Sequence, residues 1–383
     1  MIDHKKIAAL AAVKDDNCIS FFIPTHRVDG IQEDQIKYKN SIAELSKSLL
    51  AKDLNPAEVD DLLKEAKSKL QDEEFWQQLS DTLAVFIYNG KTEFYFLPYK
   101  LDAYTFIGDS LYLLPLLPMS KREDDFYLLA LSQNEVKIYE GDQYNLAELE
   151  KNDAFPESLA QILATYDADS SLQHHSGGDN STIFHGQGAG EDQENVRQEE
   201  FLRRVNEGVQ EMACDDDSKP LIVYTTPSLI GLYRQINTYP NLTENYIEGN
   251  PENETAADLH AKAWEALLPM FVAREEANDE AFEGMLAQDQ ASFNLLTIGP
   301  AAFAGRIDRL YVATNTESWG TYNPSTHLIE LHAERQPDSR PLLNDIALAV
   351  FQQGGTVNLR DRQDLARPTA HANATFRYAL QTA

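Results

Sequence analysis

The 383-residue chain has few cysteines, few basic residues and no long apolar segment. Its two cysteines, Cys18 and Cys214, exclude a disulfide framework and fit a reducing compartment, where each is expected to be a small buried side chain. The opening stretch "MIDHKKIAALAAVKDD" has an apolar run too short for a secretory signal, and no later run approaches the roughly 18 residues of a membrane-spanning helix. We therefore expect a cytoplasmic protein with no membrane partner.

Basic residues are scarce as well. The chain has 62 acidic and 32 basic residues, a net charge of −30, and residues 121–255 alone carry −18. Proteins that bind nucleic acid by themselves usually carry a basic face, because neutralising phosphates supplies much of their affinity. This acidic composition argues against a DNA-binding protein and predicts weak affinity for naked RNA, so any RNA contact would need a local basic patch.

The first third of the chain alternates strand and helix patterns. Cys18 to His26, "CISFFIPTH", has the β-branched and aromatic residues of a buried strand. Helices are expected over Glu33 to Lys52 and over Pro56 to Leu70, the second with proline in its first turn. Thr82 to Pro98 predicts a hairpin that turns at Asn89-Gly90.

The middle third repeats this alternation. Phe126 to Asp142 predicts a second hairpin, and Asp167 to Gly190 has no periodicity. A strand over Leu221 to Thr226 and a helix from Pro227 come later. Before this strand, a helix with a period near 3.6 is expected. Its one apolar face is formed by Val196, Phe201, Leu202, Val205, Val209 and Met212.

The last third predicts a helix with an apolar face from Leu259 to Phe271, and a further helical run through Met285. A strand is expected over Ile307 to Thr314, then a helix that stops at Gly354-Gly355, and "TVNL" and "ATFRYAL" as closing strands. The proline- and charge-rich stretch Pro115 to Asp125 predicts a boundary. The expected architecture is therefore α/β with three domains: 1–120, 121–255 and 256–383.

The segment "FHGQGAGEDQENVRQEEFLRRV" begins at Phe184 and joins a glycine-rich loop to the acidic helix. It lacks the third glycine of a dinucleotide fingerprint, because Glu191 stands in that place. Carboxylates at Glu191, Asp192 and Glu194 complement the helix dipole and would repel a bound phosphate. Alternating glycines let the backbone approach another surface closely. The pattern thus predicts a loop that presents its backbone to a partner.

These residues carry a resemblance. "HGQGAG" and the following helix ending in "FLRRV" resemble the H-G-R-G-G-Q loop and helix of archaeo-eukaryotic class I release factors. "CISFFIPTHR", "QIKYKN", "GRIDRLYVA" and "ATFRYAL" resemble bacterial members of that release-factor and Pelota superfamily. The resemblance implies an N-terminal α/β domain, a ribonuclease-H-like middle domain that carries the loop, and a three-layer α/β/α C-terminal domain similar to kink-turn-binding ribosomal proteins.

The resemblance implies a factor that acts in translation by binding the tRNA site of the ribosome. In the relatives, the loop enters the peptidyl transferase centre and its glutamine helps water to cleave peptidyl-tRNA. Here Gly188, Ala189 and Gly190 replace Gly-Gly-Gln, Gln187 takes the place of arginine, and no Asn-Ile-Lys-Ser motif is present. This pattern favours a rescue, silencing or hibernation role over stop-codon reading. If the chain is an enzyme, peptidyl-tRNA hydrolysis is the expected reaction, with no catalytic residue assigned and no cofactor. The presenting loop comprises His185, Gly186, Gln187, Gly188, Ala189 and Gly190.

Ribosomal RNA is the expected partner, and a translational GTPase is a further candidate. Seven basic residues are candidate contacts: Lys37, Lys39, Arg340, Arg360, Arg362, Arg367 and Arg377. The alternative for the arginines is ordinary surface salt bridging, which contributes little stability.

Two other functions stay open. His174, His175 and His185, with Asp179, could serve a stand-alone metal-dependent hydrolase, but the paired histidines diverge and no H-x-x-x-H spacing exists, so we predict no metal site. An acidic protein-binding adaptor would explain the net charge. The motif "PTHR" ends the first strand, where we expect Thr25 to cap the turn and Arg27 to pair with Glu33 or Asp34.

Overall fold

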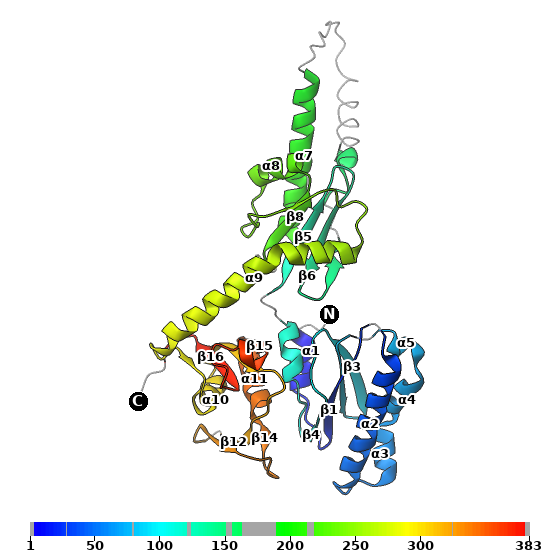
Figure 1. Cartoon of the computed structure of the whole chain (residues 1–383), viewed down its shortest axis with the longest axis vertical. Helices are drawn as coiled ribbons and strands as arrows, with labels where there is room; N and C mark the ends of the chain where they lie inside the picture. Colours follow the sequence, from blue (N-terminus) through cyan, green and yellow to red (C-terminus); the bar gives the residue numbers. More distant parts are fainter. Residues whose placement is uncertain are drawn as a thin grey trace, which may run out of the picture. The chain divides into compact units, whose positions relative to one another are not determined.

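The computed structural model describes residues 4–27, 29–78, 80–120, 124–150, 155–162, 189–212, 218–323 and 325–379; within 189–195 it describes the backbone only. The chain divides into two compact units. The terminal unit contains residues 1–122 and 276–383, and the central unit contains residues 123–275. Both combine helices with sheets, so the predicted α/β class is confirmed (Figure 1). The assignment of three domains stays a prediction.

The N-terminal half of the terminal unit is built on a four-stranded antiparallel sheet of order β3-β2-β1-β4. Its strands are β1 (Cys18–Pro24), β2 (Thr82–Tyr88), β3 (Lys91–Leu97) and β4 (Tyr104–Gly108). Strand β1 is buried on both faces, which explains its unbroken apolar sequence. Ile19, Phe21 and Ile23 pack with α2 (Ile31–Leu50), whereas Phe22 belongs to a core shared with the C-terminal half. Cys18 is buried as predicted, and burial raises the pKa of its thiol to about 11.

Local sequence signals explain most turns in this half. Asn89 and Gly90 have φ values of 46° and 70°, the left-handed conformation that the predicted hairpin turn requires. Asn55 caps the next helix with a capping box, as its position before Pro56 indicates. The prediction of one continuous helix over 56–70 is wrong. The segment forms three short helices, α3 (Pro56–Leu62), α4 (Lys64–Ser68) and η1 (Lys69–Gln71), and α5 (Glu73–Trp76) follows. Burial of Trp76, whose Nε1 donates to the Lys69 carbonyl, accompanies this break.

The C-terminal half contains a four-stranded sheet of order β10-β16-β11-β15 and a three-stranded sheet of order β13-β12-β14. The strands are β10 (Ala291–Ser292), β11 (Ile307–Ala313), β12 (Trp319–Asn323), β13 (Leu328–His332), β14 (Arg340–Pro341), β15 (Thr356–Arg360) and β16 (Ala372–Phe376). The helices α10 (Leu295–Phe303) and α11 (Leu342–Gln352) supply apolar side chains to the core. Gly354, with φ +73°, follows the end of α11 as predicted.

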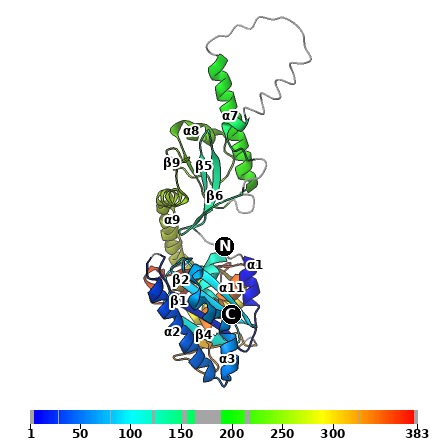
Figure 2. The same ribbon diagram turned by 90° about the vertical axis from the view of Figure 1, so that its right-hand side faces the viewer.

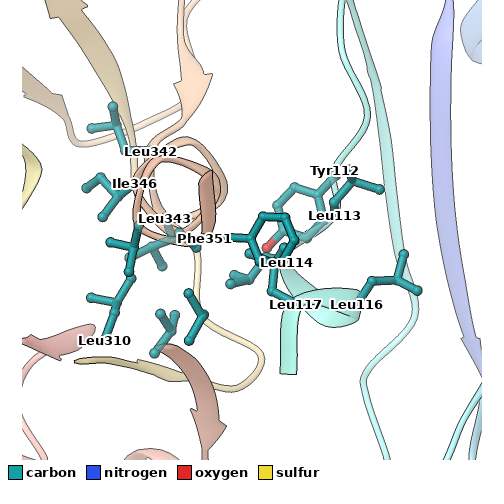
Figure 3. Close-up of a cluster of buried hydrophobic side chains, with 14 of the residues drawn as sticks. Tyr112, Leu113, Leu114, Leu116, Leu117, Leu310, Leu342, Leu343, Ile346 and Phe351 are labelled. Carbon is teal, nitrogen blue, oxygen red and sulfur yellow. The ribbon is translucent and has the colours of Figure 1, made fainter. Parts of the chain in front are cut away.

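The two halves of the terminal unit share one apolar core, to which α1 (His4–Ala11) and the 3-10 helix η2 (Leu114–Ser120) contribute. Figure 3 shows the segment from Tyr112 to Leu117 facing the side chains of α11. The stretch Pro115 to Asp125, predicted as a boundary, therefore begins as a packed element, and the division between the units follows it at residue 122. Polar contacts join the same surfaces, because Asn344 Oδ1 accepts hydrogen bonds from the amides of Leu113 and Leu114 at 2.7 and 2.9 Å.

The central unit has a mixed sheet of order β7-β6-β5-β8-β9, antiparallel from β5 to β7 and parallel from β5 to β9. Its strands are β5 (Phe126–Leu131), β6 (Val136–Gly141), β7 (Leu146–Glu148), β8 (Leu221–Thr225) and β9 (Ile247–Glu248). Alternate residues of β5 contribute to separate apolar clusters, one with α7 (Ala189–Met212) and α8 (Pro227–Ile236), the other with α9 (Ala256–Leu286). The predicted hairpin over Phe126 to Asp142 and the helix from Pro227 are confirmed; the ribonuclease-H-like label stays a prediction.

The helix α9 is one continuous element of 31 residues, where the sequence predicted two successive runs. Leu259, Ala263, Leu267 and Phe271 form its buried face in the central unit, whereas Leu268 within the same stretch is exposed. Pro269 lies inside the helix. Among the described helices, none has the length and apolar character to cross a membrane.

Candidate functional site

The supporting helix of the predicted loop is α7, which begins at Ala189 and ends at Met212. Phe201, Leu202, Val205 and Val209 are completely buried against the sheet and α8. Val196, which the sequence placed on the same face, is 66% exposed, so that part of the predicted face is wrong. Among the side chains of α7 that the structure describes, which start at Val196, complete burial begins at Phe201.

The first part of α7 extends the helix beyond these buried side chains. With a rise of 1.5 Å per residue, Ala189 lies about 18 Å along the helix axis from Phe201. Figure 2 shows α7 extending past the strands of the central sheet. The start of α7 therefore lies well away from the core that anchors the helix.

The base of α7 is fixed by close packing and by polar contacts. A Cβ added at Gly208 would lie 2.3 Å from a ring carbon of Phe155, so a larger residue would push that side chain away. Asn206 is buried, accepts from the Thr238 amide at 3.0 Å and donates from Nδ2 to the Thr238 hydroxyl at 2.9 Å. These contacts define the direction of the helix within the central unit.

The structure places only part of the predicted loop. His185, Gly186, Gln187 and Gly188 lie outside the described residues, whereas Ala189 and Gly190 form the first turn of α7. Glu191, Asp192 and Glu194 follow within the first two turns of the helix, as the sequence predicted. Carboxylates near the helix start disfavour phosphate binding there, because they already complement the positive end of the helix dipole.

The histidine-rich alternative cannot be placed in the same way. His174, His175, His185 and Asp179 all lie outside the described residues. Within the residues that the structure does describe, no group of three or more metal-ligating side chains comes together. The absence of a metal site stays a prediction.

Each of the five candidate contact arginines has a partner within the terminal unit. Arg340 donates from Nε to Asp345 at 2.6 Å and contacts Asp109, and the hydrogen bond to Asp345 is the main reason that its pKa is raised. Arg360, only 10% exposed, pairs with Asp279 at 2.9 Å, and Arg367 pairs with Glu283 at 2.7 Å. The remaining guanidinium groups donate to backbone carbonyls: Arg362 to those of Pro368 and Thr369, and Arg377 to that of Gln353. RNA contact by these arginines stays a prediction, and it would use donors left over after these bonds.

The two candidate lysines lie on α2. Lys37 forms an i,i+4 ion pair with Glu33 at 2.8 Å, and this pair lowers the pKa of the Glu33 carboxyl. Lys39 is exposed on the same helix. These lysines and the arginines belong to the terminal unit, so the candidate contacts do not share a unit with the loop.

The expected pairing of the "PTHR" motif is wrong. Arg27 bonds Asp81 at 2.8 Å and the Pro98 carbonyl at 2.9 Å, and Thr25 donates to the Ser80 carbonyl. Asp34 is completely buried and accepts from both the amide and Nδ1 of His26, each at 2.8 Å. The sequence favoured Glu33 or Asp34 because they are near Arg27 in the chain. The sheet instead brings Asp81, the residue before β2, beside the end of β1.

Comparison with known proteins bears on the central unit. Residues 126–269 match the family model "Bacterial archaeo-eukaryotic release factor family 7". This range includes the glycine-rich segment, α7 and the central sheet. Among curated proteins, none is similar enough in sequence to count as a relative.

Several solved structures are similar to this chain at low identity. Archaeal Pelota, from a model of ribosome-bound Pelota and ABCE1, is 9% identical, with 76% of this chain and 72% of that chain covered and a TM-score of 0.39. Dom34 of S. cerevisiae, a translation termination-like factor, is 11% identical, with 76% and 75% covered and a TM-score of 0.37. Archaeal translation termination factor aRF1 is 12% identical, with 98% and 99% covered and a TM-score of 0.26. These identities and TM-scores set no residue equivalences. The family-model match confirms the predicted resemblance. Over residues 126–269, the chain is similar to the bacterial archaeo-eukaryotic release factors of family 7.

Proposed function

We propose that this protein is a ribosome-associated, release-factor-like protein that acts in translation in the cytoplasm. The observation that carries the proposal is the family-model match over residues 126–269, which spans both the glycine-rich segment and its supporting helix. In the proposal, the protein binds the tRNA site and presents residues 184–190 there. Its role is rescue, silencing or hibernation, and a translational GTPase is a candidate partner.

The anchoring of α7 supports the presenting role. The helix has completely buried side chains at Phe201, Leu202, Val205 and Val209, and its backbone runs from there back to Ala189. A rigid helix of this kind sets the distance between the core and the loop. The loop can then reach a narrow site while the acidic body of the central unit stays outside it, where repulsion from RNA phosphates is weaker.

Hydrolysis is not part of the proposal, because Gly188, Ala189 and Gly190 stand where the related factors have Gly-Gly-Gln. The same difference offers a direct experiment. The double change Ala189→Gly and Gly190→Gln restores that triplet without changing the charge. Both positions lie at the start of α7, and glutamine is a better helix former than glycine there.

The binding test is co-sedimentation of the purified protein with vacant ribosomes and with ribosomes that hold peptidyl-tRNA, at low and at physiological salt. We expect saturable binding that an A-site tRNA competes away, and no peptide release by the wild-type protein. Binding that A-site tRNA does not affect would contradict the proposed site. Absence of binding at both salt concentrations would contradict ribosome association and favour the adaptor.

The double variant is tested in parallel for peptide release, with Gly190→Gln alone as the matched control. Release by the double variant and not by the control would support the proposed placement of the loop. Release by the wild-type protein would show that this loop is active without the glutamine.

A further inference from the structure

A cavity of about 220 Å³ lies in the terminal unit, where its N-terminal and C-terminal halves meet. One wall comes from β1, from β4 and from the residues that flank β4, and the opposite wall comes from β15 and the loop between β11 and β12. A bond across this junction, from the Asp102 amide to Asn315 Oδ1 at 2.9 Å, joins the two walls. An occupant would therefore contact both halves of the unit.

Three aromatic rings form the apolar part of the cavity. Phe22, Tyr104 and Tyr112 lie together, with ring centroids 6.4 Å apart for Phe22 and Tyr104, 6.0 Å for Phe22 and Tyr112, and 4.8 Å for the two tyrosines. Leucine and alanine side chains complete the lining. Such a surface binds an apolar body, and the faces of aromatic rings attract cations as well.

One polar group inside this aromatic surface has no partner. Tyr112 is only 8% exposed, and it lines both this cavity and a smaller one that shares Tyr104, Thr316 and Glu317. Among the described residues, none forms a hydrogen bond with its hydroxyl group. A hydroxyl group on a cavity wall that forms no bond with the protein is available to a polar ligand in the cavity.

The charged groups of the lining are all acidic. Asp102 and Glu317 line the cavity, and among the described residues of the lining there is no lysine, arginine or histidine. Burial, and then the nearby Tyr112 and Glu317, raise the pKa of Tyr104, while burial and Glu317 raise that of Tyr112, so both phenols stay neutral at physiological pH. Arg335 stacks over Trp319 and Phe106, at 4.7 and 5.7 Å, beside the lining.

We propose that this cavity binds a small organic cation with an apolar body, such as an aryl- or alkylammonium compound. The aromatic rings contact the body and the cationic group, Glu317 and Asp102 balance its charge, and the Tyr112 hydroxyl accepts a hydrogen bond from it. Phosphates and other anions are disfavoured, because the lining offers them two carboxylates and no cation. The volume is below that of most drug-sized pockets, which limits the ligand to a small amine.

The test compares benzylammonium with its neutral analogue benzyl alcohol, each titrated into the full-length protein at pH 7. Binding is measured by calorimetry and located through ring signals of tyrosines labelled for NMR. We expect benzylammonium to bind roughly tenfold more tightly, since cation–π and carboxylate contacts act together in a partly desolvated site. Binding should also raise the unfolding temperature of the terminal unit, because the ligand contacts both of its halves.

Variants decide which groups are responsible. Glu317→Gln should remove most of the preference for the cation, and Asp102→Asn should reduce it less. Tyr112→Phe should weaken benzylammonium binding several-fold while keeping the ring. Glu44→Gln on exposed α2 makes the same change of charge away from the cavity and should leave binding unchanged.

Equal affinity for the two probes, or an unchanged preference in both acidic variants, would overturn the proposal. Failure of benzylammonium to bind at millimolar concentration would also overturn it. Asp102 and Glu317 are both exposed, so both variants should fold, and glutamine at position 317 keeps an oxygen that can accept from Trp319 Nε1.

Discussion

The central and terminal units both combine helices with sheets, but they arrange them differently. The central unit buries alternate faces of one sheet under α7 and α8 and under α9, and α7 extends past the strands of this sheet (Figure 2). The terminal unit joins two halves that are far apart in the sequence into one apolar core, with a cavity at their junction. One unit is built to extend a helix, and the other is built to hold two segments together.

The family match and the candidate binding residues lie in different units. The family-model match lies entirely within the central unit, whereas the candidate basic contacts and the cavity lie in the terminal unit. Three kinds of substitution and one titration test this separation.

The largest expected effect is the loss of the α7 anchor. Phe201→Ala should destabilise the central unit by about 3–5 kcal/mol, because it removes a completely buried aromatic side chain. Val196→Ala on the same helix should change stability by less than about 0.5 kcal/mol, since its side chain is mostly exposed. Hydrogen exchange of the β5 and β8 amides measures both. Similar losses in the two variants would show that the anchor extends toward the loop.

The junction of the terminal unit should be nearly as sensitive. Asn344→Ala should destabilise this unit by roughly 2–4 kcal/mol, because the Leu113 and Leu114 amides lose their buried acceptor. Asn40→Ala, an exposed change on α2, is the control. Hydrogen exchange should show the loss in the terminal unit alone. An equal loss in the central unit would mean that the two units unfold together.

A smaller effect is expected on ribosome binding. Lys39→Glu should weaken binding a few-fold and reduce the slope of log affinity against log salt by about 1, if Lys39 contacts a phosphate. Lys64→Glu changes another exposed lysine of the terminal unit by the same charge. Equal effects from the two variants would indicate a general charge effect and no contact at Lys39.

The smallest expected effect is on the pH dependence of the terminal unit. Burial, and then Arg362, lower the pKa of His371, whose Nδ1 lies 2.6 Å from the Ser318 hydroxyl. A histidine with a lowered pKa in the folded state favours the neutral form, so its contribution is complete above the ordinary value near 6.5 and is lost as the pH falls below it. Urea midpoints between pH 7.5 and 5 should fall more steeply in the wild-type protein than in His371→Gln. Identical slopes would contradict this assignment.

Local patterns were enough to predict many elements of both units. Strong periodicity and turn chemistry identified β1, the Asn89-Gly90 hairpin, the first turn at Pro56 and the end of α11. Short strands such as β9, β10 and β14 were not predicted, because two residues leave no period to detect. Pairing at long range was the other failure: Arg27 meets Asp81, and Asn344 meets the 113–114 amides, through tertiary packing that sequence spacing does not encode.

The functional features were also predicted only in part. The family resemblance came from the loop and helix motif, which a sequence displays directly, and the match over 126–269 confirmed it. The cavity was not predicted, since Phe22, Tyr112 and Glu317 come from three distant segments and each looks like an ordinary residue of its own segment. Asn344, a polar residue within the apolar run "LLNDIALAVF", indicates a buried contact of α11, although the sequence does not identify its partner.

The most direct test of the proposed role is a cryo-EM reconstruction of the protein bound to a bacterial ribosome that holds peptidyl-tRNA. The account predicts the central unit in the A site, with the start of α7 and residues 184–190 directed to the acceptor end of the tRNA and the peptidyl bond intact. A protein bound elsewhere on the ribosome, or with the start of α7 facing away from the tRNA, would contradict it.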